Sequence, residues 1–300
     1  MPDSAEWDVA VIGAGPAGLE AANSSALAGA RTVVLERAQH PRYKTCGGGL
    51  IGVSLTAISG TPVPVKDEIY AATFTRNSGH EFTRKRDSPI LKMVMRDEFD
   101  DVLRRRAMAN GAVLLQRAPV RAVSQNGRHA RVKLANGKSV TAQVVVGADG
   151  SSGVTARHVG VDFCQVDLGL EVEINVPVPV RQVWHGRVLL DWGPIPGSYA
   201  WVFPKDDKLT VGVIAARGHG EQTKAYLQDF LYHHNLASFE RVHDSGHLTR
   251  CRTEGSPLRK GRVLVAGDAA GLLEPWTREG ISFALRSGAL AGAAAAEAAR

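Results

Sequence analysis

The stretch from Asp8 to Glu36, which reads DVAVIGAGPAGLEAANSSALAGARTVVLE, decides the fold of this chain. Its apolar run Val9–Ile12 has the length of a buried parallel strand and leads directly into the turn Gly13–Gly18. An Ala-rich helical stretch follows, is expected to end near Gly29, and precedes a second apolar run at Thr32–Leu35. This order of strand, turn, helix and strand predicts a βαβ unit of the kind that binds a dinucleotide.

The turn places its residues where such a unit needs them. Gly13 permits the tight turn, Gly15 lets the backbone approach a pyrophosphate, and Gly18 lets helix and strand pack closely. The helix begins around Pro16 and Ala17, and its N-terminus offers free N–H groups and a positive dipole end to the phosphates. We therefore expect these five residues to bind a cofactor. The alternative is a glycine-rich turn that only packs an α/β fold.

Glu36 ends the second strand about 20 residues after the glycines. An acid at this position can accept hydrogen bonds from the hydroxyls of an adenosine ribose. Glu36 is therefore expected to bind the cofactor as well.

The composition describes an ordinary globular protein with a basic surface. The 300 residues, 44% hydrophobic and 22% charged, suffice for one large α/β domain or two smaller ones. The net charge of +6 favours anionic partners, which could be lipid surfaces, nucleic acid or the phosphates of a cofactor. The basic run Arg104–Arg106 lies in a predicted helix and reads as a solvated helix face, so no nucleic-acid partner is expected.

The cysteines and the N-terminus indicate a cytoplasmic location. Cys46, Cys164 and Cys251 are odd in number and form no CxxC pair, which argues for a reducing compartment and against disulfides or a zinc site. The ten histidines are scattered, so no metal is expected. The first strand begins too early for a signal peptide, and no apolar run reaches the roughly 18 residues of a membrane span. Any contact with the inner membrane face would be peripheral.

Residues 61–160 contain short strands and one helix. Arg96 precedes a stretch with helical spacing that ends at Gly111. The hairpin signals Asn126-Gly127 and Asn136-Gly137 predict a three-stranded antiparallel meander, whose last strand leads into GADGSS at Gly147–Ser152.

The pattern changes between Val161 and Gly255, where alternating β-rich runs surround one helix at about 224–234. The chain then returns to a buried strand at Arg262–Ala266 and to a helix from about Glu279. We predict an α/β fold in which a Rossmann-like domain (1–60, 92–160 and 256–300) receives an inserted antiparallel β-sheet substrate domain (61–91 and 161–255).

Two further turns, at Asp149-Gly150 and Gly267-Asp268, share one design in which a strand leads into an Asp that can cap a turn or face a ligand. Each alone reads equally well as a capped turn. Together with the opening βαβ unit they resemble the two-domain FAD-dependent oxidoreductases of the aromatic-hydroxylase type. The resemblance implies FAD as cofactor, with Asp268 on the ribityl chain and Arg96 at the phosphates or the adenosine side.

Two motifs narrow the resemblance to the geranylgeranyl reductases. The loop KTCGGG at 44–49 is similar to their KxCGGG loop, and YAWVFP at 199–204 is similar to their YxWxFP strand. The segment GDAAGLLEPWTREGISFAL resembles their last motif, but Arg278 stands where many members have Gly. A different backbone course beside the flavin is therefore expected at Arg278.

The resemblance implies a set of site residues. Cys46 is expected to tune the flavin or to help deliver a proton, with Gly48 beside it, although a buried packing thiol would look the same. The remaining FAD-binding residues implied are Arg37, Lys44, Cys46, Gly47, Asp149, Gly150, Gly267, Gly280 and Ile281. The aromatic side chains Tyr199, Trp201 and Phe203 share one strand face and could line a lipid tunnel or a plain core. Pro204, which is expected to end that strand, is the fourth substrate residue that the resemblance implies.

The resemblance implies a reductase that saturates C=C bonds of a prenyl lipid, with NAD(P)H or another reductant as electron donor. The alternative is an FAD-dependent monooxygenase that hydroxylates an aromatic or polyketide substrate with NAD(P)H and O2. A flavin-dependent halogenase would carry the motif WxWxIP. This chain has Tyr199 in place of its first Trp and Phe203 in place of its Ile. A non-catalytic flavoprotein is a third class.

Overall fold

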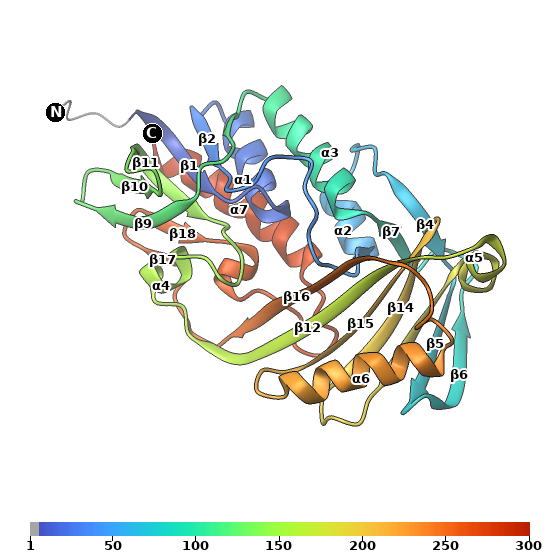
Figure 1. Cartoon of the computed structure of the whole chain (residues 1–300). Coiled ribbons are helices and arrows are strands. Elements are labelled where there is room, and N and C mark those ends of the chain that lie inside the picture. Colours follow the sequence, from blue (N-terminus) through green and yellow to red (C-terminus); the bar gives the residue numbers. More distant parts are fainter. Residues whose placement is uncertain (1–5) are drawn as a thin grey trace.

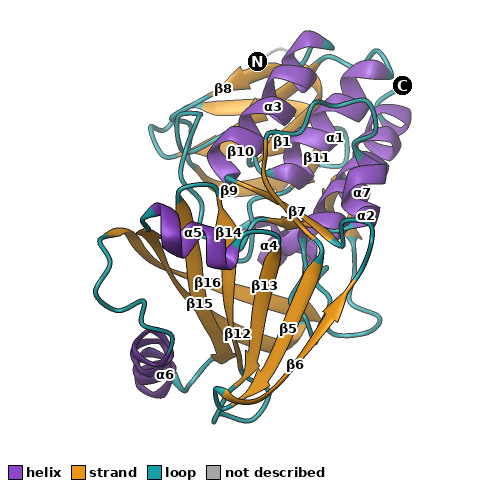
Figure 2. Cartoon of the chain, turned by 90° about the vertical axis from the view of Figure 1, so that its right-hand side faces the viewer, coloured by secondary structure: helices purple, strands orange, loops and turns teal. Residues whose placement is uncertain are grey.

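The computed structural model describes residues 6–300, so the first five residues of the predicted cofactor domain lie outside it. Figure 1 shows two large sheets, one covered by long helices and the other carrying α6 (Gly220–His233) on its outer side. Figure 2, turned by 90°, shows the helices α1, α3 and α7 in one half of the molecule and the strands of the second large sheet in the other.

The first large sheet is parallel at its centre, as the βαβ pattern predicts. Strand β1 (Trp7–Ile12) pairs in parallel with β2 (Thr32–Leu35) and with β11 (Ser139–Gly147), and β11 pairs in parallel with β18 (Val263–Val265). The four strands run in one direction, so their carboxyl ends meet at one edge of the sheet. The remaining strands of this sheet are β8 (Val113–Leu115), β9 (Val120–Gln125), β10 (Ala130–Leu134) and β17 (Arg259–Lys260).

Three helices cover one face of this sheet: α1 (Pro16–Leu27), α3 (Arg96–Ala109) and α7 (Ile281–Ala298). Helices α1 and α7 pack almost backbone to backbone, because a Cβ at Gly288 or Gly292 would lie 2.2 Å from a carbonyl oxygen of α1. The meander β9–β10–β11 is confirmed. The reading of Arg104–Arg106 as a solvated face is wrong for Arg106, because the packing of α3 on α1 brings its guanidinium to Glu20.

The second large sheet has the order β16-β12-β15-β14-β13-β5-β6 and is antiparallel apart from one pair, since β5 and β13 run in parallel. Helix α6 covers one face with Tyr226, Phe230 and Leu231. The strands are β5 (Ala71–Arg76), β6 (Gly79–Lys85), β12 (Phe163–Asn175), β13 (Arg187–Trp192), β14 (Tyr199–Lys205), β15 (Lys208–Ala216) and β16 (Arg241–Arg252).

The prediction that Pro204 ends its strand is wrong, because β14 continues to Lys205 and Pro204 opposes Leu209 of β15. Pro204 lies beyond Val202, the last residue of β14 that pairs with β13. A proline is tolerated there because no neighbouring strand on that side is paired with it.

A small sheet of β3 (Gly49–Leu50), β7 (Leu91–Val94) and β4 (Val65–Ile69) stands beside the two large ones. Its strands come from both sides of the predicted boundary at residue 60, so the exact domain limits stay a prediction. Three short α-helices, α2 (Gly52–Ala57), α4 (Thr155–Val159) and α5 (Val178–Trp184), and one 3-10 helix at Gly267–Ala270 complete the described chain.

Candidate functional site

The three glycine- and aspartate-bearing turns meet at the carboxyl edge of the parallel sheet. Gly13 lies against the second turn, since a Cβ on it would be 2.3 Å from the carbonyl oxygen of Ala148. Gly267 lies against the first helix, where its Cβ would be 2.9 Å from that of Ala17. Residues up to 254 positions apart in sequence therefore form one surface.

The glycines of the first turn divide into two kinds. Gly13 has a φ of +98°, and a Cβ on Gly18 would lie 1.9 Å from the carbonyl oxygen of Gly13, so both are required by the protein's own packing. Gly15 is different, because the nearest atom to its Cβ position is Arg42 Nη2 at 3.8 Å. Its bare backbone faces free space at the N-terminus of α1, where no side chain caps the helix. A pyrophosphate would fit this opening.

Glu36 is already bonded to the protein. Its two oxygens accept hydrogen bonds from the backbone N–H groups of Ala14 (2.7 Å) and Ala38 (2.8 Å), and its side chain is buried. Arg42, which the sequence analysis missed, donates to the carbonyl oxygen of Ala14 at 3.2 Å and pairs with Asp100 at 3.1 Å. Its guanidinium adds a positive charge beside the turn.

Asp149 faces inward and caps a turn. One carboxylate oxygen accepts from the N–H groups of Val154 (2.7 Å) and Thr155 (3.1 Å). Burial raises the pKa of Asp149 above its ordinary value, although these hydrogen bonds oppose the rise. Gly150 follows with free space around it. At this turn the Asp shapes the backbone, and the bare Gly150 is what a ligand could touch.

Asp268 is the carboxylate of the site that remains open to a ligand. Its side chain is 31% exposed, and His247 Nε2 lies 3.5 Å from Oδ2. Burial opposes its charge, but His247 and nearby Lys44 outweigh that effect and hold the pKa of Asp268 below its ordinary value. A Cβ on Gly280 would lie 3.5 Å from Oδ1, and Ile281 begins α7 directly after it.

Arg96 is buried at the start of α3 and forms a double hydrogen bond with Asp100 at 2.8 and 2.9 Å. Burial opposes its charge, yet Asp100 and the nearby Cys46 thiol raise the pKa of Arg96. Burial and the positive charge of the nearby Arg96 both lower the pKa of Lys44. The cations and the carboxylate Asp268 therefore suit the phosphates and the polyol of FAD respectively.

The Cys46 loop contacts the second large sheet. The N–H of Cys46 donates to Glu171 Oε1 at 3.0 Å, and Lys205 Nζ donates to the carbonyl oxygen of Cys46 at 3.3 Å. A Cβ on Gly47 would lie 2.7 Å from Phe203 Cε2, and one on Gly48 would lie 2.3 Å from the carbonyl oxygen of Val94. The two motifs of the reductase resemblance thus lie against one another.

The aromatic row Tyr199, Trp201 and Phe203 lies on the face of β14 that turns toward this loop. The ring centroids are 5.8 Å apart for the first pair and 6.1 Å for the second. The alternate residues Ala200 and Val202 pack under α6 on the other face. The indole N–H of Trp201 is buried and has no hydrogen-bond partner in the described part of the chain. The row is therefore separate from the core of that sheet.

Arg278 takes a left-handed backbone with a φ of +56°, the region that favours glycine, which the resemblance implies at this position. Its Nε donates to Asp167 Oδ2 at 3.0 Å and its Nη2 to the carbonyl oxygen of Gly197 at 3.0 Å, and both charged side chains are buried. The guanidinium also lies 5.6 Å from the ring centre of Tyr199. Arg278 thus ties the segment before α7 to the second sheet.

Some predicted residues and features lie elsewhere. Arg37 is exposed, and Pro204 is buried inside β14.

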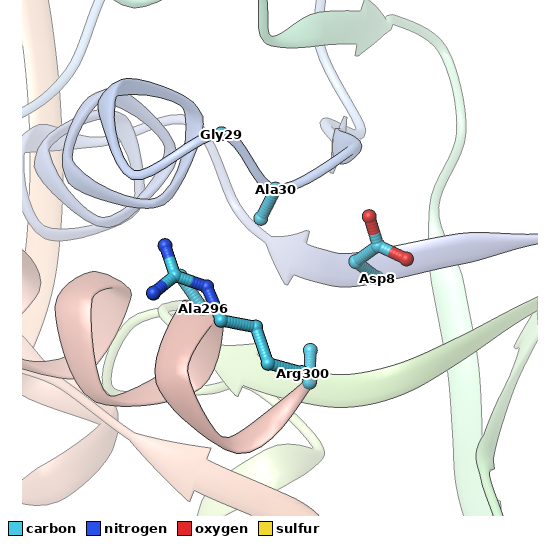
Figure 3. Close-up of a pocket in the computed structure, with 6 residues that line it drawn as sticks. Asp8, Gly29, Ala30, Ala296 and Arg300 are labelled. Atoms are coloured by element: carbon cyan, nitrogen blue, oxygen red, sulfur yellow. The ribbon is translucent and has the colours of Figure 1, made fainter.

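A cavity of about 130 Å³ lies at the opposite, amino edge of the parallel sheet, and Figure 3 shows Asp8, Ala30 and Arg300 around it. Within residues 6–300, no helix has the length and apolarity needed to cross a bilayer, and no three potential metal ligands gather.

Comparisons with known proteins identify the family and the cofactor. A family model described as FAD binding domain matches residues 6–298. The chain is 30% identical over 321 positions to digeranylgeranylglycerophospholipid reductase 2 of Methanopyrus kandleri, covering 98% of this chain and 78% of that protein.

Two solved structures have the same fold. The geranylgeranyl bacteriochlorophyll reductase-like protein of Thermoplasma acidophilum matches with a TM-score of 0.85 at 25% identity, covering 97% of this chain and 78% of that one. A flavin-dependent brominase matches with a TM-score of 0.76 at 20% identity, covering 98% and 79%, which shows a common fold alone. FAD is the cofactor, as predicted. The chain belongs to the FAD binding domain family and, within it, to the geranylgeranyl reductase family of FAD-dependent oxidoreductases.

Proposed function

We propose that the protein is an FAD-dependent reductase that saturates C=C double bonds of a prenyl lipid of the geranylgeranyl type. The observation that carries this proposal is the contact between the Cys46 loop and the aromatic row, made where Gly47 meets Phe203. An apolar surface of three aromatic rings suits an isoprenoid chain, which offers no polar group along its length.

The residues of the chain would have distinct tasks. The open backbone at Gly15 and the cations Arg42 and Arg96 would hold the diphosphate of FAD, and Asp268 would hold its polyol. When bound, reduced FAD supplies the hydride that one alkene carbon receives. The aromatic row would orient the chain and exclude water. Cys46, whose thiol lies near the Arg96 guanidinium, would hold or pass a proton for the other carbon.

The decisive experiment is anaerobic. The purified protein, loaded with FAD and reduced by dithionite, receives geranylgeranyl diphosphate or a menaquinone, and mass spectrometry follows the products. A gain of two hydrogens per double bond, lost in Cys46→Ala, is the expected result. If the prenyl substrate is not reduced, and an aromatic compound is oxygenated in the presence of air and NADPH, the monooxygenase alternative is established instead. NADPH and NADH are then added separately to the oxidised protein, and loss of the flavin absorbance shows which of them donates electrons. If neither reduces the flavin, the donor is another reductant.

We also propose a peripheral contact with anionic membranes through an outer aromatic surface. Trp276 and Phe82 are 64% and 50% exposed, and stacked rings connect them through Trp192 and Phe74 at centroid distances of 5.0 to 6.1 Å. Exposed basic residues follow Phe82 at positions 84 to 86. Aromatic and basic side chains together are typical of a membrane interface. Flotation with anionic but not neutral vesicles, weakened in Trp276→Ala, is expected; equal behaviour with both vesicle types would contradict it.

A further inference from the structure

Two buried charged side chains of the second sheet bind the backbone of Cys46, one at its N–H group and the other at its carbonyl oxygen. Glu171 of β12 accepts the N–H of Cys46 at 3.0 Å, and Lys205 of β14 donates to its carbonyl oxygen at 3.3 Å. Glu171 is 1% exposed and Lys205 is 2% exposed. The neighbours on the other face of β12, Val172 and Ile174, show that apolar residues suit this strand.

Burial of a charged side chain costs free energy unless the charge is paired or hydrogen-bonded, so the burial of Glu171 and Lys205 needs a structural explanation. Lys205 Nζ lies 4.0 Å from Glu173 Oε1, which is too far for a hydrogen bond and leaves Glu173 as a weak ionic partner. Among the described residues, Glu173 Oε2 is buried without a hydrogen-bond partner. In the described part of the chain, the hydrogen bonds of Glu171 and Lys205 are those to Cys46, and no ion pair within 4.0 Å joins the two side chains to each other.

The surroundings of Glu171 are charged on several sides. Glu173 faces it from β12 itself, Lys205 from β14, and Lys44 and Cys46 from the loop. Tyr43 also lies near, bonded to Ser245 of β16 at 2.9 Å and stacked on His243. Burial is the main effect on Glu171, outweighs Lys205 and Lys44, and raises its pKa to about 7.

We propose that Glu171 and Lys205 are positioning residues for Cys46, and that loss of the Glu171 proton tightens their hold on the loop. A carboxylate accepts a hydrogen bond about twice as strong as one to a neutral acid. The loop is then fixed more firmly above neutral pH than below it. The hold stands on geometry, whereas its value for catalysis rests on the proposed function.

The test measures alkylation of Cys46 in the whole FAD-loaded chain. Iodoacetamide is added at pH 6 and pH 8, and mass spectrometry compares modification of Cys46 with that of the exposed Cys164 in the same molecule. The ratio of Cys46 modification to Cys164 modification in the wild type is then divided by the same ratio in Glu171→Gln. The glutamine keeps a hydrogen-bond acceptor but does not titrate. We expect this quotient to be near one at pH 6 and about fivefold lower at pH 8, the difference between a neutral and a charged hydrogen bond.

Two further variants sharpen the test. Lys205→Met is expected to raise Cys46 alkylation several-fold at both pH values, because the hydrogen bond to the Cys46 carbonyl oxygen is lost. Glu173→Gln is the matched control on the same strand face without a bond to Cys46, and it should keep the fall between pH 6 and pH 8. Melting temperatures confirm that each variant is folded.

Other outcomes would overturn the proposal. A quotient that stays constant from pH 6 to pH 8 would exclude Glu171 as the titrating group, and unchanged alkylation in Lys205→Met would exclude Lys205. No prenyl substrate enters the measurement, so its result is independent of whether the protein reduces alkenes.

Discussion

The parallel sheet and the seven-stranded sheet contribute to the site in different ways. In the parallel sheet, strands end in short turns, where Gly13 and Gly18 allow two backbone segments to touch and Gly15 leaves its backbone open at the start of α1. In the seven-stranded sheet, the surface consists of side chains on one face of the strands, such as Glu171 and Trp201.

This difference predicts how amino-acid substitutions act in each of the two sheets. Backbone turns tolerate no added atom where two chain segments touch, so substitutions there act through sterics. Side chains on a sheet face can be replaced without moving the backbone, so substitutions there act through charge and hydrogen bonding. Four predictions test this contrast.

The largest effect is expected from Gly18→Ala. The new Cβ would lie 1.9 Å from the carbonyl oxygen and 3.0 Å from the carbonyl carbon of Gly13, and both atoms belong to the backbone of the turn between β1 and α1. We expect the free energy of unfolding to fall by at least about 4 kcal/mol, above the usual cost of overpacking. Urea denaturation measures this. Gly52→Ala, at a helix start with nothing within 4 Å of the new Cβ, is the control and should be neutral or slightly stabilising; equal losses in both variants would refute the steric argument.

Arg278→Ala should have the next largest effect, this time through charge. It leaves Asp167 buried without its cation, which costs about 3 to 4 kcal/mol of unfolding free energy. Arg278→Gly loses the same ion pair but relieves the left-handed backbone, so it should be about 1 kcal/mol more stable than Arg278→Ala. Thermal and urea unfolding of both variants check this order. If Arg278→Gly were the less stable of the two, the backbone at 278 would carry no strain.

The fold of the parallel half followed from the sequence because its signals are local. Strand, turn and helix from Val9 to Leu35 lie within one stretch of chain, and the meander is marked by its two Asn-Gly turns. The hold on Cys46 could not be predicted, because Glu171 and Lys205 lie 125 and 159 residues away along the chain. The only signal was two acids on one face of a strand whose other face is apolar.

The aromatic row shows a second limit of the sequence. Three aromatic side chains at alternate positions fit a core face as well as a substrate surface. The choice is made by α6, which packs on Ala200 and Val202 and leaves the row on the opposite face, toward Gly47. The sequence marked Arg278 as a departure from the motif that it resembles, but nothing in the sequence pointed to Asp167 as the partner of Arg278.

The pH dependence of stability should reveal Glu171 in the side-chain half. Its pKa is about 7 in the folded protein and about 4.5 when unfolded, so the folded state binds the proton more tightly. The stability that this proton contributes is complete below pH 4.5 and is lost as the pH rises through 7, by at most about 3 kcal/mol. Glu20 titrates in the same range, so the measurement is the difference in unfolding free energy between the wild type and Glu171→Gln. A difference that does not change between pH 4.5 and pH 8 would contradict the raised pKa.

The smallest effect on the fold, and the most informative about the cofactor, is expected from Gly15→Ala. Unlike Gly18, Gly15 has no protein atom closer than 3.8 Å to its Cβ position, and its φ is −87°, which alanine adopts without strain. The unfolding free energy without FAD should therefore stay within about 0.5 kcal/mol of the wild type. The added methyl group would occupy the space that a pyrophosphate needs at the start of α1, so FAD should bind at least about tenfold more weakly, a loss of about 1.4 kcal/mol. Flavin fluorescence titration gives the affinity, and unfolding of the flavin-free protein gives the stability. A variant that binds FAD normally would mean that the open backbone at Gly15 does not face the phosphates, whereas a variant that unfolds would place Gly15 with Gly18 among the packing glycines.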